Sequence, residues 1–288
     1  MTECDRLGWS LQGEHYVLPD DAFEKKKFLI YRTVHGVGDW GIITAMPRLL
    51  KEAFPDCEVY IPSVKMLTET WGHSSRHNNW INPYDIPAQL FKNNPYVDGI
   101  VDTWEDEIYH DHFRIVDDTN ENDPLILQML RFHRVPVSTE TDYLPELYFS
   151  EEERVEYSNI RKKLFGDEPY IAFSARRSIQ ELTDAWGNKE KAEYMLECVK
   201  KISADYADIP TLTYNTAGLD FNINTVASAE GIPLRTLLYL ICNAFAAVGQ
   251  QTGVYDTCSR YTTVKVVPHS NRLAENFLKS VNYAHLEK

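Results

Sequence analysis

Three glycines and one aspartate between residues 36 and 41 form the stretch of the sequence best suited to chemistry. Gly36, Gly38 and Gly41 have the spacing of a dinucleotide-binding turn, in which glycines let the backbone approach a pyrophosphate. Asp39 stands inside this turn, and a carboxylate within reach of a hydroxyl can act as a general base. The same carboxylate would repel phosphates placed beside it. The stretch therefore allows two different chemistries, dinucleotide binding and proton abstraction.

The dinucleotide interpretation lacks one of its usual partners. It requires an acidic residue at the end of the second strand, where a carboxylate holds a ribose hydroxyl. The predicted second strand, residues 57–63, ends with Pro62 and Ser63, whereas Glu58 lies at its start. An NAD(P)-dependent enzyme is thus an alternative that rests on the glycines alone. A third interpretation is purely structural: the glycines let a strand and a helix pack, and Asp39 caps the helix.

The elements around this turn form a strand–turn–helix–strand unit. A β-prone run at 28–34 precedes the glycines, apolar residues at helical spacing fill 40–55, and 57–63 follows as a strand. Pro47 lies inside the helical segment and predicts an irregular or kinked first turn. The pattern restarts with strands at 170–175, 210–215, 244–249 and 262–268, and with helices at 188–203 and 233–243. This alternation predicts an α/β fold with two parallel, helix-covered sheets.

Length and composition bound the domain organisation. The chain has 288 residues, which favours two domains of about 100–150 residues each. We predict an N-terminal Rossmann-like domain at 1–150, with 1–26 as an extension, a second at 151–270, and a final helix at 271–288. Hydrophobic residues make up 43% and charged residues 25%, as in an ordinary globular protein. The net charge of −14 argues against a surface that neutralises many nucleic-acid phosphates.

Cysteine usage and hydropathy indicate the compartment. The five cysteines are scattered and form no Cys-x-x-Cys pair, which is typical of reduced thiols. The N-terminus has neither the basic region nor the apolar core of a signal peptide. The longest apolar run, residues 237–249, is too short to span a bilayer and contains Asn243. The sequence therefore predicts a cytoplasmic protein without a membrane span.

Several short motifs occur in the order found in one enzyme family. They are Gly38-Asp39, Pro47, Leu50-Lys51 and Phe54-Pro55 in the first half, and Thr252-Gly253 in the second. Across residues 28–275 the sequence resembles the heptosyltransferase-like family of inverting glycosyltransferases. The resemblance implies the GT-B architecture, in which two Rossmann-like domains face a central cleft and the final helix crosses back to the first domain. It also implies a nucleotide-sugar donor as substrate and no cofactor.

The resemblance assigns roles to particular residues. It makes Asp39 the general base. The residues expected on the acceptor side are Gly38, Trp40, His73, Arg76 and His77. The residues expected to hold the donor are Gln250, Gln251, Thr252, Gly253, Arg176 and Arg177. Backbone N–H groups of the second turn would meet the diphosphate, and arginine suits bidentate phosphate contacts.

The sequence departs from the family pattern at three places. Gln251 stands where the family has an acidic residue, and Asp256 or nothing replaces the histidine that follows it. Asp184 and Ala185 stand where a lysine precedes the position of Trp186. These departures leave a second alternative, a catalytically silent binding protein of the same fold.

The search for metal ligands favours metal-independent transfer. His73 and His77 have i, i+4 spacing but no third ligand at a diagnostic distance, and the cluster at 107–112 lies in a highly charged segment. No Asp-x-Asp motif stands at a strand end. We therefore predict inverting, metal-independent glycosyl transfer. The acceptor is left among lipopolysaccharide core or another glycan, a protein, and a hydroxylated base in viral DNA, although the acidity of the chain weighs against DNA.

Overall fold

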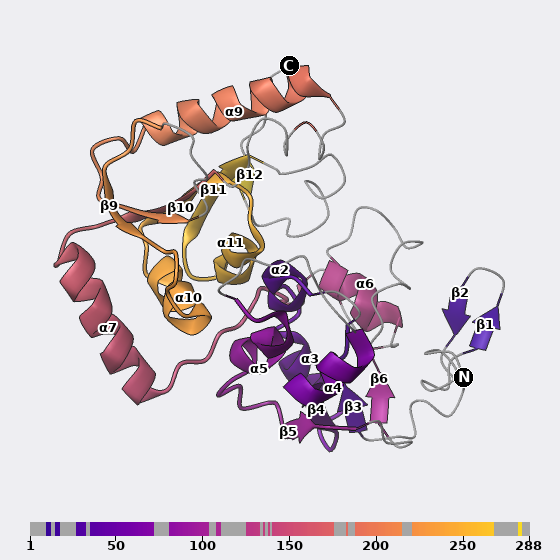
Figure 1. Ribbon diagram of the computed structural model, residues 1–288. Helices are drawn as coiled ribbons and strands as arrows, with labels where there is room; N and C mark the ends of the chain where they lie inside the picture. Colours follow the sequence, from indigo (N-terminus) through magenta and orange to yellow (C-terminus); the bar gives the residue numbers. More distant parts are fainter. Residues whose placement is uncertain are drawn as a thin grey trace. The chain divides into compact units, whose positions relative to one another are not determined.

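The computed structural model describes residues 10–12, 15–17, 27–32, 35–71, 81–103, 108–110, 125–132, 135, 138, 140–175, 183, 188–214, 221–267 and 282–283. The chain divides into two compact units, Met1–Tyr148 and Phe149–Lys288 (Figure 1). This division falls beside the boundary predicted at residue 150. A short antiparallel hairpin, β1 (Ser10–Gln12) and β2 (His15–Val17), lies in the predicted extension.

The first unit contains a parallel sheet with the strand order β5-β4-β3-β6 (Figure 1). Its strands are β3 (Lys27–Leu29), β4 (Glu58–Pro62), β5 (Gly99–Val101) and β6 (Ile108–His110). Ile30 continues the pairing of β3, because its N–H donates to the Tyr60 carbonyl at 2.9 Å.

The helices of the first unit are short. They are α2 (Val37–Gly41), α3 (Met46–Ala53), α4 (Val64–Trp71), α5 (Ile86–Leu90) and α6 (Leu125–Phe132), with the 3-10 turn η2 (Pro83–Asp85) before α5. The helix predicted at 40–55 is broken into α2 and α3 by a turn at residues 42–45. Pro47 lies in the first turn of α3, where its missing N–H would have no helical partner. The irregular first turn predicted from Pro47 is therefore a complete break.

The second unit contains a larger parallel sheet with the strand order β12-β11-β10-β7-β8-β9 (Figure 1). Its strands are β7 (Ile171–Ser174), β8 (Thr211–Tyr214), β9 (Thr225–Ser228), β10 (Ala246–Gln250), β11 (Thr263–Val267) and β12 (Asn282–Tyr283). The central strand β10 is buried at every residue, as expected when helices cover both faces. Phe173 and Val248 of the sheet pack with Met195 and Val199 of helix α9 (Lys189–Ala204) in one core cluster.

Helix α7 (Glu151–Phe165) opens the second unit with strong capping signals. Ser150 Oγ accepts from the Glu153 N–H at 3.2 Å, and Glu153 Oε2 accepts from the Ser150 N–H at 3.1 Å. This reciprocal capping box satisfies two donors that a helix start leaves without partners. Gly166, with φ of +64°, ends the helix in the left-handed region that favours glycine. The remaining helices are α10 (Leu234–Cys242) and α11 (Gly253–Cys258).

The last segment differs from the expected helix where the structure describes it. Asn282 and Tyr283 form strand β12, which pairs in parallel with β11. Pairing with β11 satisfies backbone groups that a bare sheet edge would leave exposed, and this favours a strand at these two residues. Most of 271–288 lies outside the described residues, so a crossing back to the first unit stays a prediction. None of the described helices combines the length and apolar character needed to cross a bilayer.

Candidate functional site

Asp39 lies on the short helix α2 that follows strand β3. The Gly36 N–H donates to Asp39 Oδ2 at 3.1 Å, so the carboxylate caps the start of its own helix. A Cβ on residue 36 would lie 2.4 Å from that oxygen, so any other residue there would displace the Asp39 carboxylate from its present position. Among the described residues no group donates to the other oxygen, Oδ1. The half-buried carboxylate therefore combines a fixed orientation with one oxygen that the described chain leaves unused.

Packing fixes the rest of α2. The indole of Trp40 is fully buried and meets the ring of Phe91 edge to face, with centroids 6.4 Å apart. Gly38 and Gly41 are buried on the same helix. Trp40 was expected on the acceptor side, but a fully buried indole has no surface to offer an acceptor. It is instead a core residue that orients the helix carrying Asp39.

His35 is a neighbour of Asp39 that the sequence reasoning missed. It lies one residue before Gly36, the residue that caps α2. Burial lowers the pKa of His35 below its usual 6.5, and the charge of the Asp39 carboxylate opposes that shift. A neutral imidazole near pH 7 thus stands beside the candidate base. The i, i+4 spacing of the two residues across the glycine turn was the signal that could have found it.

The second turn follows strand β10 as predicted. Gln250, Gln251 and Thr252 are almost fully buried, and Thr252 is the N-cap residue of α11. Its hydroxyl accepts from the Tyr255 N–H at 3.4 Å, and α11 begins at Gly253. The N–H groups in the first turn of a helix have no carbonyl partner within it. The turn therefore presents backbone donors at the carboxyl end of the central strand.

Gln251 contacts a buried carboxylate that the motif comparison had left without a role. Its Nε2 donates to Asp256 Oδ2 at 3.1 Å and to Oδ1 at 3.3 Å. Asp256 is only 3% exposed. Position 251 is neutral, but a negative charge lies directly against it, supplied from α11. The sequence placed the two residues five apart, a spacing that predicts no contact until the turn conformation is known.

Further buried polar groups gather at the carboxyl end of the second sheet. Ser174 ends β7 opposite Gly249 of β10, and both Ser174 Oγ and the Tyr255 hydroxyl are buried without a hydrogen-bond partner among the described residues. Burial raises the pKa of Tyr255 well above its usual value, and the neighbouring Tyr214, at the end of β8, adds to the shift. Ligands of open parallel sheets bind at this edge. The arrangement is thus a polar, desolvated sheet end.

Several residues expected at the site lie outside the described residues. These are His73, Arg76 and His77 on the acceptor side, Arg176 and Arg177 on the donor side, and Trp186 with the residues before it. The part of the chain that is described contains no group of three or more His, Cys, Asp or Glu side chains placed to hold a metal ion.

Solved structures identify this arrangement of sheets. A glycosyltransferase family 9 protein from Veillonella parvula DSM 2008 superposes over 92% of this chain and 86% of its own, with a TM-score of 0.55 and 11% identity. E. coli ADP-heptose LPS heptosyltransferase II superposes over 91% of both chains, with a TM-score of 0.53 and 12% identity. The chain has the fold of glycosyltransferase family 9. No family model matches the sequence, and neither does any curated protein.

This likeness confirms the predicted fold class, an α/β protein with parallel sheets similar to the GT-B glycosyltransferases. At 11% and 12% identity it establishes the fold alone. The order of weak motifs along the chain had indicated the same heptosyltransferase-like relatives. Their order was informative because Gly38-Asp39 follows β3, the motifs from Pro47 to Pro55 lie in and directly after α3, and Thr252-Gly253 follows β10, so the order reflects the succession of elements.

Proposed function

We propose that the protein is a glycosyltransferase that moves a sugar from a nucleotide-sugar donor to an acceptor hydroxyl, with inversion and without a metal ion. The observation that carries the proposal is the geometry of Asp39 on a family 9 fold. Its carboxylate lies just beyond the carboxyl end of β3, is oriented by the Gly36 N–H, and keeps Oδ1 unused among the described residues. That placement suits a general base at the ligand-binding edge of a parallel sheet.

In the proposed reaction Asp39 Oδ1 takes the proton of the acceptor hydroxyl. The acceptor oxygen forms a bond to the anomeric carbon while the bond from that carbon to the diphosphate oxygen breaks. The departing nucleoside diphosphate keeps the bonding electron pair, and attack from the opposite side inverts the anomeric centre. The Gly36 N–H holds Oδ2 throughout, so the base needs no reorientation.

The turn after β10 is the proposed donor site. Backbone N–H groups at Thr252 and Gly253 would meet the diphosphate, and Arg176 or Arg177 would add bidentate positive charge. Asp256 holds the amide nitrogen of Gln251, so the contact of residue 251 with the donor sugar would be neutral. With the diphosphate held by backbone and arginine, donor affinity should survive excess EDTA. Loss of binding on chelation and its recovery with Mn²⁺ would overturn the metal-free assignment.

The decisive experiment compares two substitutions of Asp39. Asn can still accept from the Gly36 N–H, so Asp39→Asn keeps the helix cap but removes the base, whereas Asp39→Ala removes both. We expect Asp39→Asn to lower the transfer rate about 10²–10⁴-fold with unchanged thermal stability and donor binding. Asp85→Asn is the matched control, because Asp85 is a half-buried carboxylate of the same unit, bonded to Gln89. Normal turnover in a folded Asp39→Asn protein would remove Asp39 from the mechanism.

Substrates are assigned by measuring nucleoside diphosphate release from a panel of nucleotide sugars. The E. coli neighbour is an ADP-heptose LPS heptosyltransferase, so ADP-heptose with lipopolysaccharide core is the first pair to test. UDP-, GDP- and dTDP-sugars follow, with protein and hydroxylated viral DNA as further acceptors.

A catalytically silent binding protein is the second candidate, favoured by the neutral Gln251. It predicts thermal stabilisation by one nucleotide sugar without release of its diphosphate.

A further inference from the structure

Thr44 lies at the break between α2 and α3 and fastens the end of the helix that carries Asp39. Its hydroxyl donates to the Gly41 carbonyl at 2.8 Å, and its N–H donates to the same carbonyl at 3.2 Å. Gly41 is the last residue of α2. Thr44 is fully buried, so water does not compete for these bonds. The side chain of Thr44 therefore holds the carboxyl end of α2, together with the packing of Trp40 on Phe91.

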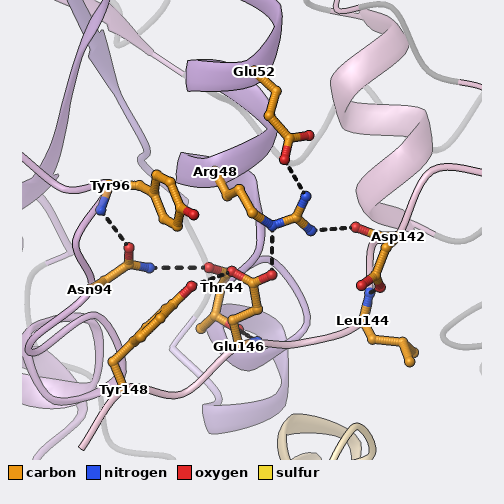
Figure 2. A network of polar contacts seen from close by, with 9 residues as sticks. All are labelled: Thr44, Arg48, Glu52, Asn94, Tyr96, Asp142, Leu144, Glu146 and Tyr148. Carbon is orange, nitrogen blue, oxygen red and sulfur yellow. Dashed lines mark hydrogen bonds and ion pairs between the residues drawn. The ribbon is translucent and has the colours of Figure 1, made fainter. Parts of the chain in front are cut away.

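Thr44 is itself held by the segment that ends the first unit (Figure 2). The Glu146 N–H donates to Thr44 Oγ1 at 2.8 Å, and Asn94 Nδ2 lies 3.4 Å from the Thr44 carbonyl. Glu146 has its carboxylate oxygens divided between two partners, Arg48 Nε at 2.7 Å and the Tyr148 hydroxyl at 2.8 Å. The ion pair between Arg48 and Glu146 is largely buried, which strengthens it relative to a surface pair.

Arg48 extends this hold to the start of the same segment. Its Nη2 donates to the Asp142 carbonyl at 2.5 Å, and its Nη1 pairs with Glu52 Oε1 at 2.8 Å (Figure 2). Two residues of the segment 142–148 are thus bonded to the turn at 42–45 and to α3: Asp142 to Arg48, and Glu146 to both Arg48 and Thr44. Thr44 connects the two groups of contacts, because its hydroxyl donates to Gly41 of α2 and accepts from the Glu146 N–H of the segment.

A helix as short as α2 needs such support. Five residues form too few internal hydrogen bonds to be stable alone. The amino end is held by the contact between Gly36 and Asp39, and the carboxyl end by Thr44. Asp39 lies between these two points. A shift at Gly41 would therefore be transmitted within one helical turn to the Asp39 carboxylate.

We infer that Thr44, locked by Glu146, is a positioning residue for Asp39. This inference rests on the proposed function, in which Asp39 is the base. Thr44 does not touch the substrate. It keeps α2 in the one orientation that presents the carboxylate, and the first-unit segment 142–148 supplies the rigidity.

The first test measures amide hydrogen exchange and uses no ligand. In Thr44→Val the hydroxyl is lost at nearly constant volume, so exchange in residues 37–45 should become faster while residues 46–53 of α3 stay unchanged. Thr44→Ser keeps the hydroxyl and should restore protection. Thr68→Val is the matched control, because Thr68 is exposed and, among the described residues, its hydroxyl bonds to the Val64 carbonyl of its own helix α4. Unchanged exchange at 37–45 in Thr44→Val would overturn the inference.

The second test separates positioning from folding by kinetics. With ADP-heptose, or with the donor that turns over in the panel above, Thr44→Val should lower kcat about 10- to 100-fold. The KM for the donor should stay the same, and Thr44→Ser should recover the rate. Tyr148→Phe, which removes the hydroxyl bonded to Glu146 but leaves the bond from the Glu146 N–H to Thr44, should lower kcat less. The double variant Asp39→Asn/Thr44→Val should be no slower than Asp39→Asn alone, because both act through one carboxylate.

The outcomes distinguish the positioning role of Thr44 from the proposed role of Asp39 as the base. Additive losses in the double variant would show that Thr44 acts independently of Asp39 and would overturn the inference alone. Normal turnover in Asp39→Asn would instead remove the proposed role of the base. If no panel donor turns over, the proposed function fails, and the exchange measurement still decides whether Thr44 holds α2.

Discussion

Gly249 should tolerate replacement less well than Gly166 or Gly231, the other glycines of the second unit with positive φ among the described residues. It lies in the central strand β10 with φ of +110°, in the region that favours glycine, and pairs with Ser174 of β7. A Cβ on residue 249 would lie 2.2 Å from the Ser174 carbonyl oxygen and 3.0 Å from the Phe173 ring. The first contact is with backbone of a buried neighbouring strand, which cannot rotate away. Gly249→Ala therefore requires the two central strands to separate.

The expected cost has two parts. A non-glycine residue in the left-handed region costs about 1–2 kcal/mol, and overpacking of a well-packed core costs about 1–3 kcal/mol. The sum, about 2–5 kcal/mol, should appear as a lower free energy of unfolding in urea. Gly231→Ala is the matched control: its φ is +78°, but a Cβ there would meet nothing within 4 Å. It should show only the first part, about 1–2 kcal/mol.

The difference between the two variants measures the close approach of β10 and β7 directly. Because Gly249 precedes Gln250 and Gln251, its replacement should also weaken donor binding, whereas Gly231→Ala should not. Equal losses of unfolding free energy in the two variants would refute the reasoning. That result would mean that β10 and β7 are not as close at residue 249 as the structure places them.

Three further outcomes are expected. Arg235 and Glu153 form a buried bidentate pair with distances of 2.7 and 2.8 Å, so Arg235→Met should cost about 3–5 kcal/mol of unfolding free energy by leaving a buried charge. The double variant with Glu153→Gln should cost less than the sum of the two single changes. Burial lowers the pKa of His35, so the folded state keeps its full stability above about pH 6.5 and loses unfolding free energy as the pH falls through the lowered pKa. Urea titrations at pH 7 and pH 5 should therefore show a smaller loss of unfolding free energy on acidification in His35→Gln than in the unsubstituted protein. Thr252→Ala removes a helix cap and should cost about 0.5–2 kcal/mol in the same urea assay.

The central strands β7 and β10 of the second unit were predictable because burial on both faces leaves a nearly continuous apolar run. Predictions at 170–175, 244–249 and 262–268 correspond to β7, β10 and β11 within a residue or two at each end. These strands lie next to one another in the sheet; β7 and β10 are buried at every residue, whereas β11 alternates buried valines with the exposed Thr263 and Lys265. The strand predicted at 210–215 corresponds to β8, whose residues are all buried although two of them, Thr211 and Thr213, are polar.

The break between α2 and α3 could not be predicted from local sequence. Residues 40–55 have helical spacing throughout, and Pro47 by itself allows a kink as well as a break. The turn is held by Thr44, whose partner Glu146 is 102 residues further along the chain. Helix propensity depends on residues within a turn or two, so a helix boundary fixed by a distant segment cannot be recognised from the local sequence. The same holds for Trp40, whose burial against Phe91 removes it from the acceptor side.

The second turn shows why comparing a motif position by position gives an incomplete account of a site. In the sequence alone, the neutral Gln251 replaces an acidic residue of the family pattern, and this favours a catalytically silent protein. In the structure the turn brings the Asp256 carboxylate against the Gln251 amide, where both are buried. A buried carboxylate acts on its surroundings through its distance, whichever residue number carries it. The electrostatic environment at the end of β10 therefore retains a negative charge that the aligned position lacks. Asp256→Asn, with the fold kept by the amide, is the change that would make this turn as neutral as its sequence suggests.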